Sequence, residues 1–216
     1  MAEEGAENGH RIPIRERIEL WSAALLAAAT VATAYSAYEA TRWGGVQATS
    51  FTEAGSARTE SAKAESDGFT LVSIDANIFT QYAVAFSQDN DRLERILRDR
   101  FFRDEFMTAY RAWLMQRPLT NPKAAKLPFQ LPEYRIAKLE EADRLSDKAN
   151  RLFNKGREAN QTSDNYILAT IFFAAVLFFA GLSPKFKADR IAIAALGFGS
   201  LMFVAGLIRL GTLPFH

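Results

Sequence analysis

The sequence has no cysteine and only two histidines, His10 and His216, among its 216 residues. The absence of cysteine excludes a disulfide framework and thiolate metal sites, and it leaves the redox compartment undetermined. Both histidines lie near the ends of the chain, so they do not predict a metal-binding cluster. The net charge of +1 gives no long-range field that would attract nucleic acid. We therefore expect no cofactor, no metal and no nucleic-acid partner.

Sequence motifs of common enzymes are also missing. The chain has no Gly-x-Ser-x-Gly elbow and no His-Glu-x-x-His motif. The stretch Gly197-Phe198-Gly199 lies inside an apolar run, and no lysine with a serine or threonine is placed after it as a phosphate-binding loop requires. Acidic residues at 140–143 alternate with basic ones at helical spacing, which is typical of a solvated helix face. We expect a protein that is not an enzyme.

Charge is absent from two long hydrophobic runs, residues 166–182 and 191–208. Each run approaches the length that crosses a hydrocarbon core of about 30 Å at a rise of about 1.5 Å per residue. The short basic link 183–190 joins them, so together they predict a membrane hairpin. A third apolar run, at residues 20–38, is longer than a usual signal-peptide core and ends in aromatic residues. We interpret it as a retained first span.

The three spans differ in composition. The first is rich in alanine, which contributes little insertion energy but permits close approach of another helix. The second is rich in phenylalanine. The first span is therefore predicted to be the one most enclosed by protein, and the second the one most exposed to lipid. In the third span, Gly199 and Gly206 predict a helix-packing seam.

These features predict an all-α integral membrane protein with three transmembrane helices and a helical stalk and soluble insert between the first and second spans. The expected segments are a disordered or juxtamembrane N-terminal tail at 1–18, spans at 19–40, 166–182 and 191–208, a helical region at 41–165, and a C-terminal tail at 209–216.

Two seams of small residues, spaced alternately by three and four, predict helices that pack closely in a coiled coil. The first seam follows the first span and comprises Ala48, Thr52, Gly55, Thr59, Ala62, Ser66 and Phe69. The second precedes the second span and comprises Ala142, Leu145, Ala149, Leu152, Gly156, Ala159, Ser163 and Tyr166. Either seam can pack within the chain or against another copy. Two ordinary solvated helices are the alternative, because alanine-rich sequences generate such seams by chance.

Glycines are expected to disturb the helix that follows the first span. Gly44-Gly45 predicts a kink, and Asp67-Gly68 predicts an interruption. Residues 87–91 predict a turn and a new helix start, since Asp and Asn cap free N–H groups.

The next segment, residues 92–116, has the period of one amphipathic helix. Its aromatic stripe is expected to pack against residues 78–86 as a small core, with a binding site as the less favoured interpretation. The prolines between residues 117 and 132 predict an irregular loop that packs down on this core. Glu133 is expected to open the longest helix of the chain.

Basic residues predict the orientation in the membrane. They precede the first span and occupy the 183–190 link, at Arg11, Arg15, Arg17, Lys185, Lys187 and Arg190. The positive-inside tendency places both segments in the cytoplasm and residues 41–165 outside it. Basic residues that flank the spans on the other side oppose this assignment, but long translocated regions count less.

Polar side chains along the first span raise the possibility of an ion path. The hydroxyls of Thr30, Thr33 and Ser36 would line it, and Glu39 and Arg42 would form charged rings at its mouth. Three spans cannot enclose a path alone, so a pore would require a homo-oligomer. Interfacial anchoring, with hydroxyls bonded to their own backbone, is the favoured alternative.

The chain resembles a group of uncharacterised bacterial membrane proteins with one N-terminal span, a helical middle region and a C-terminal two-span hairpin. The resemblance rests on Trp43, Asp75, the segment 100–113, Asn121-Pro122, Tyr134 and the segment 177–181. It implies the same architecture and a multi-pass setting in the bacterial inner membrane. It implies no activity.

Two functional hypotheses follow. The leading one is a non-enzymatic protein of the lipid bilayer that forms a homo-oligomer through its seams and has a structural or interaction role, with the protein partner unknown. The alternative is a homo-oligomeric channel lined by the first span.

Overall fold

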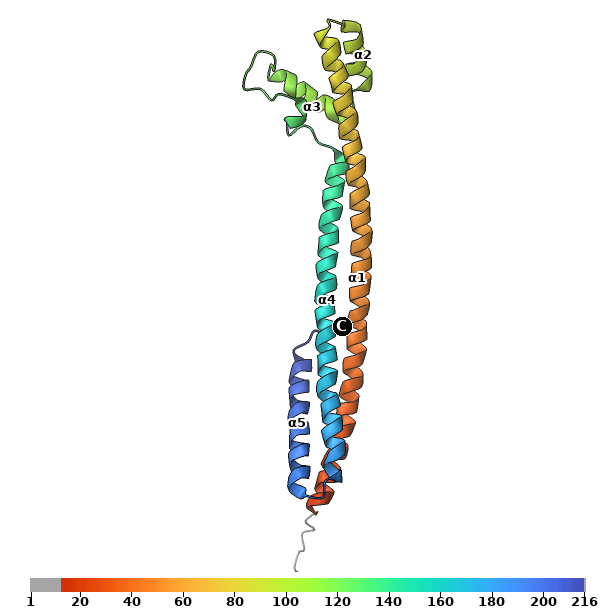
Figure 1. The fold of residues 1–216 in the computed structure, drawn as a ribbon, viewed down its shortest axis with the longest axis vertical. Coiled ribbons are helices and arrows are strands. Elements are labelled where there is room, and N and C mark those ends of the chain that lie inside the picture. The colour runs from red at the N-terminus through yellow and green to blue at the C-terminus, as the bar shows by residue number, and fades with distance from the viewer. Residues whose placement is uncertain (1–12, 216) are drawn as a thin grey trace, which may run out of the picture. The chain divides into compact units, whose positions relative to one another are not determined.

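The computed structural model describes residues 13–215 and is built from helices (Figure 1). The elements are α1 (Ile14–Ser87), α2 (Asp91–Phe101), α3 (Asp104–Met115), the 3-10 helix η1 (Pro128–Gln130), α4 (Ala137–Leu182), the 3-10 helix η2 (Ser183–Lys185) and α5 (Asp189–Gly211). No strand occurs in this part of the chain, so the expected all-α class is confirmed. Helices α1, α4 and α5 are each long and apolar enough to cross a membrane.

Helix α1 begins within the segment expected to be a disordered or juxtamembrane tail. Residues 14–18 form the first turn of the helix, which excludes disorder at these positions. The Arg17 amide donates to the Pro13 carbonyl at 3.1 Å, and a proline directly before a helix costs no hydrogen bond. Residues 1–12, which make up most of the expected tail and include His10, lie outside the described residues, as does His216.

Helix α1 is continuous from Ile14 to Ser87, so the expected kink at Gly44-Gly45 and the interruption at Asp67-Gly68 are wrong. One of these glycines serves close packing instead. A Cβ on Gly68 would lie 2.5 Å from Cδ2 of Leu139, whereas one on Gly44 would make an ordinary contact, 3.9 Å from Oγ of Ser163. Glycine is tolerated inside a helix at a cost of about 1 kcal/mol, and packing against a neighbouring helix offsets that cost.

The chain divides into two compact units, which are described separately. The spanning unit comprises Met1–Phe51 and Asn154–His216, and the insert unit comprises Thr52–Phe153.

In the spanning unit, α4 is the helix most enclosed by its neighbours. Its buried stripe comprises Tyr166, Ala169, Phe173, Val176 and Ala180, at steps of three and four. Within their most apolar stretches, 33% of α4 is buried, against 17% of α1 and of α5. Within one copy of the chain, the prediction that the alanine-rich first span is the most enclosed, and the phenylalanine-rich second span the most exposed, is therefore wrong. Hydropathy measures composition, whereas enclosure depends on which helix is central.

Helix α5 lies alongside α4 (Figure 1) and approaches it through glycine. Gly199 and Gly206 are both buried. A Cβ on Gly206 would lie 2.7 Å from Cε1 of Phe173, and a Cβ on Gly199 would lie 3.5 Å from Cβ of Phe179. At Gly206 a larger residue would displace the phenylalanine ring, so glycine sets the distance between the two helices.

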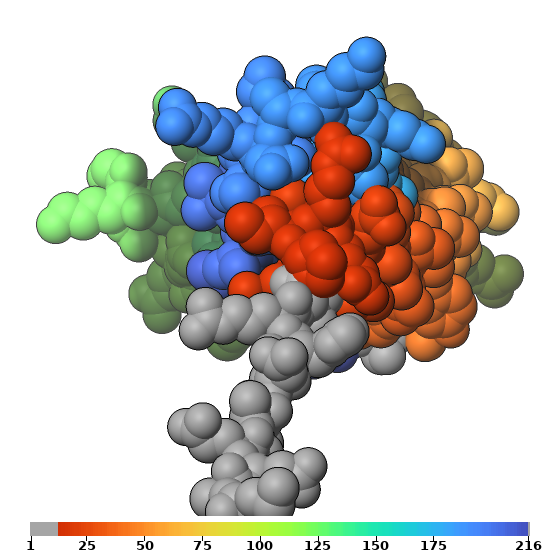
Figure 2. All heavy atoms as spheres, turned by 90° about the horizontal axis from the view of Figure 1, so that it is seen from below, coloured from red at the N-terminus to blue at the C-terminus, as the bar shows by residue number. Residues whose placement is uncertain are grey.

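The two ends of the spanning unit are closed by different contacts. At one end, the Arg15 guanidinium donates to the carbonyls of Phe186 and Lys187 and lies 3.6 Å from the Asp189 carboxylate. Figure 2 shows the first residues of α1, in red, beside the blue link between α4 and α5. At the other end, the Tyr166 hydroxyl donates to the Pro214 carbonyl at 3.1 Å. Which end faces the cytoplasm stays a prediction.

The α4 seam lies against α1 in both units. In the insert unit, Ala142 and Ala149 are buried, Leu145 and Leu152 are half-buried, and Ser61 donates to the Ala142 carbonyl at 2.8 Å. In the spanning unit, Gly156 and Ala159 are buried, and a Cβ on Gly156 would lie 2.5 Å from the Phe51 ring.

The first seam has the opposite environment. Its residues, Ala48, Thr52, Gly55, Thr59, Ala62, Ser66 and Phe69, are all exposed. The side of α1 that packs in the insert unit carries Ala54, Ala57, Ala64 and Gly68 instead. The predicted seam of small residues therefore lies on the exposed side of α1, and not on the side that packs within the insert unit.

The end of α1 and the start of α2 follow the expected turn. Asp89 has φ of 53° and Asn90 donates its amide to the Ala85 carbonyl at 3.0 Å, while the Asp89 amide donates to Phe86 at 3.2 Å. This is a Schellman motif, which satisfies the last carbonyls of a helix. The Asn90 side chain then accepts from the Leu93 amide at 3.1 Å and caps α2.

The single helix expected over residues 92–116 is wrong, because it is broken into α2 and α3. Phe102 and Arg103 have extended backbone conformations, with ψ of 123° and 155°. The break lets the Phe102 ring enter the aromatic core and the Arg103 guanidinium reach Asp75. Contacts with a residue 28 positions away outweigh the local helical period here.

The proline-containing segment packs down, as expected, through Pro128 and Phe129. The expected start of the next helix at Glu133 is wrong, because α4 begins at Ala137. The intervening residues include Tyr134, whose hydroxyl reaches the Asp75 carboxylate. Nor is this helix the longest, since α1 has 74 residues and α4 has 46.

Candidate functional site

An aromatic core holds the insert unit together. Its buried members are Phe79, Tyr82, Ala85, Leu97, Phe106 and Tyr110, and Ile78, Phe102, Met107, Trp113, Phe129 and Tyr134 pack against them. Many ring pairs meet edge to face, such as Phe79 and Trp113 with centroids 5.7 Å apart. The expectation that the aromatic stripe of residues 92–116 packs against residues 78–86 is confirmed. Most of these rings are structural.

A buried ion pair fixes one side of this core. The Asp75 carboxylate is 1% exposed and accepts two hydrogen bonds from the Arg103 guanidinium, each 3.0 Å long. The Tyr134 hydroxyl donates to the same carboxylate at 2.9 Å. Arg103 also lies 2.7 Å from the Glu105 carboxylate. One residue of α1 thereby ties together the break before α3 and the segment that leads into α4.

The hydrogen bonds around Asp75 affect the titration of its partners. Burial, and then the hydrogen bond to Asp75, raise the pKa of Tyr134 above its ordinary value. The hydrogen bond to the same carboxylate raises the pKa of Arg103. Both groups therefore keep their protons near neutral pH, and their hydrogen bonds to Asp75 tie the structure together.

A second polar contact lies between α1 and α3. The hydroxyls of Tyr82 and Tyr110 are hydrogen-bonded to each other, and Tyr82 also donates to the Glu94 carboxylate at 3.0 Å. Burial, followed by the hydrogen bond with Tyr110, raises the pKa of Tyr82. Burial likewise raises the pKa of Tyr110. The pair stays protonated at neutral pH.

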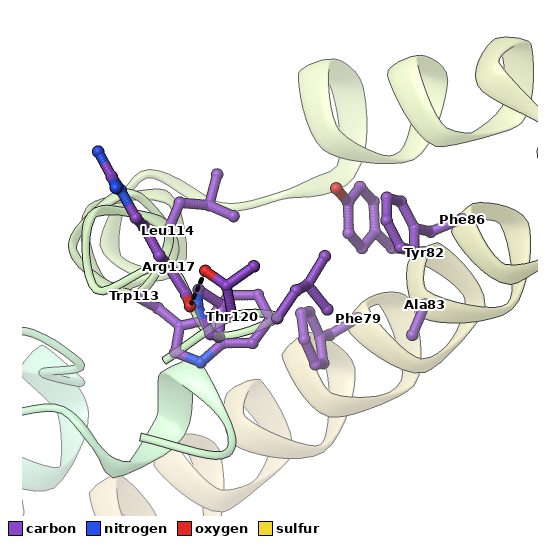
Figure 3. A pocket seen from close by; sticks show the side chains of 10 residues that line it. Phe79, Tyr82, Ala83, Phe86, Trp113, Leu114, Arg117 and Thr120 are labelled. Atoms are coloured by element: carbon purple, nitrogen blue, oxygen red, sulfur yellow. Dashed lines mark hydrogen bonds between the residues drawn. The ribbon is translucent and has the colours of Figure 1, made fainter. Parts of the chain in front are cut away.

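Beside this core the insert unit has an open apolar pocket of about 400 Å³ between α1, the end of α3 and the turn that follows it. Figure 3 shows its walls, with Phe79, Tyr82 and Phe86 on α1 facing Trp113, Leu114 and Thr120. The remaining lining residues are Ala83, Arg117, Pro118 and Leu119. The pocket volume falls within the usual range of about 300–1,000 Å³ for small-molecule sites.

The candidate pore residues of the first span do not share one environment. Thr30 is exposed, Thr33 is half-buried and Ser36 is fully buried. Each hydroxyl donates to the carbonyl four residues earlier, at 2.7–2.8 Å. Such bonds to the helix's own backbone match the interfacial alternative.

The two charged candidates at the mouth are also separated in environment. Glu39 is 3% exposed, and its Oε2 has no hydrogen-bond partner among the described residues. Arg42 is exposed, lies over the Tyr38 ring at 5.7 Å and donates to its hydroxyl at 3.4 Å. The structure therefore turns Glu39 inward and Arg42 outward.

The exposed face of α1 in the insert unit is unusual in its chemistry. From Gly55 to Phe69 it carries no charged residue at the seam positions, although charged residues flank it at Arg58, Lys63 and Glu65. The Thr59 hydroxyl donates to the Gly55 carbonyl at 3.1 Å, so its proton is already used within the helix. A surface hollow of about 630 Å³ lies over the same face, lined by Ala62, Glu65, Ser66, Phe69, Thr70 and Ser73.

Sequence reasoning missed two features of the insert unit. Asp75 and Arg103 are distant in sequence, and only the charge of Asp75 within an apolar stretch of α1 signals a buried partner. The pocket depends on the turn at residues 117–120, which the prolines marked only as irregular. Within the described residues, no cluster of histidine, aspartate or glutamate has the geometry of a metal site.

Comparisons with protein-family models, with curated proteins and with solved structures found no match for this chain.

Proposed function

We propose that this chain is a non-enzymatic integral membrane protein that associates with further copies of itself along α1 and has a structural or interaction role. The observation that carries the proposal is the uncharged exposed face of α1 in the insert unit. The exposed side of a solvated helix normally carries charge. Here the seam positions on that side carry none, with Lys63 beside them; they are Gly55, Thr59, Ala62, Ser66 and Phe69.

The order of these residues supports helix-to-helix contact. Alternating steps of four and three give a seam that can interdigitate with a second helix. The flanking charges have both signs, with Arg58 and Lys63 basic and Glu65 acidic. Charges beside a coiled-coil seam fix partner and register. Phe69, 56% exposed, adds a large apolar side chain to the face.

The spanning unit offers a comparable surface. The exposed residues of α1 there include Ala23, Ala24, Ala27, Ala28, Ala34 and Ala37. Lipid provides no hydrophobic driving force between helices, so association depends on close backbone packing, which small residues permit. By contrast, the seam of α4 is occupied by α1 of the same chain. Because of that contrast, we assign self-association to α1.

We further propose that residues 41–165 lie outside the cytoplasm of a bacterial cell, with the N-terminus inside. The basic residues Arg15, Arg17, Lys185, Lys187 and Arg190 support this orientation. The insert unit would then be the part that meets other proteins or ligands.

Molecular mass in detergent tests the proposal. The wild-type chain is expected to have a mass above that of the 24.1 kDa monomer, after detergent is accounted for by light scattering. Ala62→Glu is expected to shift the population to monomer, because it places a charge on the uncharged face. Glu60→Lys changes charge off that face and serves as the matched control. A wild-type monomer across a range of concentrations would refute self-association.

The alternative of a homo-oligomeric channel stays a prediction. Single-channel recording in planar bilayers tests it, and a conductance changed by Thr30→Ala or Arg42→Gln would support it. The inward position of Ser36 and Glu39 gives it less support than self-association alone.

A further inference from the structure

The pocket of the insert unit has a preformed wall. Arg117 has φ of 52°, in the left-handed region, and its amide donates to the Leu114 carbonyl at 2.9 Å. The Asn121 amide donates to the Arg117 carbonyl at 2.9 Å, and the Asn121 side chain donates to Gln116 at 3.0 Å. These bonds hold the turn at residues 117–120 in place before any ligand arrives. A preorganised wall lowers the entropic cost of binding.

The uncharged polar side-chain groups around the pocket, those of Tyr82, Trp113 and Thr120, are already hydrogen-bonded within the chain. The Tyr82 hydroxyl is bonded to Glu94 and Tyr110, and the Trp113 indole N–H donates to the Ala125 carbonyl at 2.7 Å. The Thr120 hydroxyl lies 3.4 Å from the Arg117 carbonyl, to which it donates. A ligand that needs hydrogen bonds would lose its bonds to water here without replacement.

The charge of the lining, carried by Arg117, does not face the cavity. In Figure 3 the Arg117 guanidinium points away from the rings of Phe79 and Phe86. A carboxylate or phosphate in the pocket would therefore lie in apolar surroundings without a cation directed at it. That arrangement disfavours a charged ligand.

The rest of the wall is apolar and open to solvent. Phe86, Leu114 and Leu119 are 48%, 45% and 78% exposed. Removing such apolar surface from water is favourable. We propose that this pocket binds an uncharged, apolar small molecule, such as a hydrocarbon chain or ring compound without an ionised group. Such binding does not depend on self-association of α1.

Photolabelling of the full chain in lipid nanodiscs tests the proposal. The probe is a medium-chain alkyl diazirine without a polar group, and mass spectrometry of peptides maps its adducts. Saturable adducts within residues 113–120 are expected, and excess unlabelled alkane is expected to suppress them. The spans are labelled by probe that is dissolved in the surrounding lipid. Their adducts serve as an internal reference that does not saturate.

Three variants locate the site. Ala83→Trp fills the pocket and is expected to reduce labelling of residues 113–120 about tenfold, because the indole occupies the space. Thr80→Trp, at an exposed position on the same helix outside the lining, is expected to leave labelling unchanged. Leu119→Asp puts a charge at the rim without touching the core, and it is also expected to weaken labelling. This variant tests the site if Ala83→Trp disturbs folding.

Several results would overturn the inference. Labelling of residues 113–120 that is absent, does not saturate, or is equal in Ala83→Trp and Thr80→Trp would exclude a site in the pocket. Stronger labelling by the matching diazirine carboxylate would exclude an uncharged ligand.

Discussion

Replacing Asp75 by asparagine removes the charge around which the insert unit is tied. The carboxylate accepts two bonds from Arg103 and one from Tyr134, and it is almost fully buried. Breaking a buried ion pair by changing one partner costs about 3–5 kcal/mol. Arg103 is 22% exposed and keeps Glu105 at 2.7 Å, so the lower end applies. We expect a loss of about 3 kcal/mol.

Amide hydrogen exchange of the full chain in detergent measures this loss locally. Each 1.36 kcal/mol changes an equilibrium constant tenfold, so a loss of about 3 kcal/mol makes exchange in α2 and α3 about 150-fold faster. Helix α5 is expected to be unaffected, because it belongs to the spanning unit. Glu105→Gln, which removes only the outer contact of Arg103, is expected to change exchange less than about fivefold.

A double variant separates the ion pair from burial alone. Asp75→Asn combined with Arg103→Met is expected to cost less than the sum of the single changes, because each single change leaves the other partner unpaired. Exchange in α2 and α3 that rises less than about threefold in Asp75→Asn would refute the assignment of this pair as the tie of the insert unit.

Four further predictions follow from the structure. The buried tyrosines of the insert unit have raised pKa values, so the folded unit keeps protons that the unfolded chain releases above pH of about 10. The contribution of these tyrosines to stability is therefore fully present below that pH and falls as pH rises further, by about 1.4 kcal/mol per pH unit for each such group. Tyr134→Phe is expected to flatten this decline in urea titrations between pH 9 and 11.5, and an unchanged slope would contradict the prediction. Asp89→Gly is expected to stabilise the insert unit by about 1 kcal/mol, because glycine adopts positive φ without strain, and a lower urea midpoint would contradict this. Gly206→Ala is expected to lower the thermal midpoint in detergent through its contact with Phe173, at a cost of about 1–3 kcal/mol, whereas Gly197→Ala, with nothing within 4 Å of the new Cβ, is expected to match or exceed wild type; equal midpoints would refute the close approach. Glu39→Gln is expected to raise that midpoint, since it removes a buried carboxylate whose Oε2 has no partner among the described residues, and a clear decrease would show that the charge is needed.

Composition is enough to identify the spans, because an uncharged apolar run of sufficient length is typical of a membrane-crossing helix. It cannot rank their enclosure. Phenylalanine in α4 looks like a lipid-facing residue, yet Phe173 is fully buried between helices. An apolar side chain has the same hydropathy whether lipid or protein covers it, so sequence alone cannot distinguish the two.

Local periodicity predicts helices better than their ends. The break at Phe102 and Arg103 arises from a contact with Asp75, and no local signal competes with the helical period there. The capping residues at positions 87–91 are local, and they are predicted correctly. The glycines are misjudged for the same reason, since Gly68 is required by Leu139 of another helix and not by a turn.

The seams illustrate what spacing does and does not establish. Both have the same alternation of steps, but that of α4 lies against α1 and that of α1 faces outward. The side of α1 that packs has small residues as well, at Ala54, Ala57 and Ala64, so small residues on both sides leave the choice open. The candidate pore residues share their chemistry, but the helix turns Thr30 and Ser36 to different sides.

Disulfide cross-linking tests self-association along α1 most directly, because the chain has no cysteine of its own. Thr59→Cys places a thiol on the uncharged face, and Glu60→Cys places one at the adjacent exposed position off that face. In native membranes under mild oxidation, we expect a covalent dimer for Thr59→Cys and little dimer for Glu60→Cys. Equal yields from the two positions, or none from Thr59→Cys, would contradict self-association along this face.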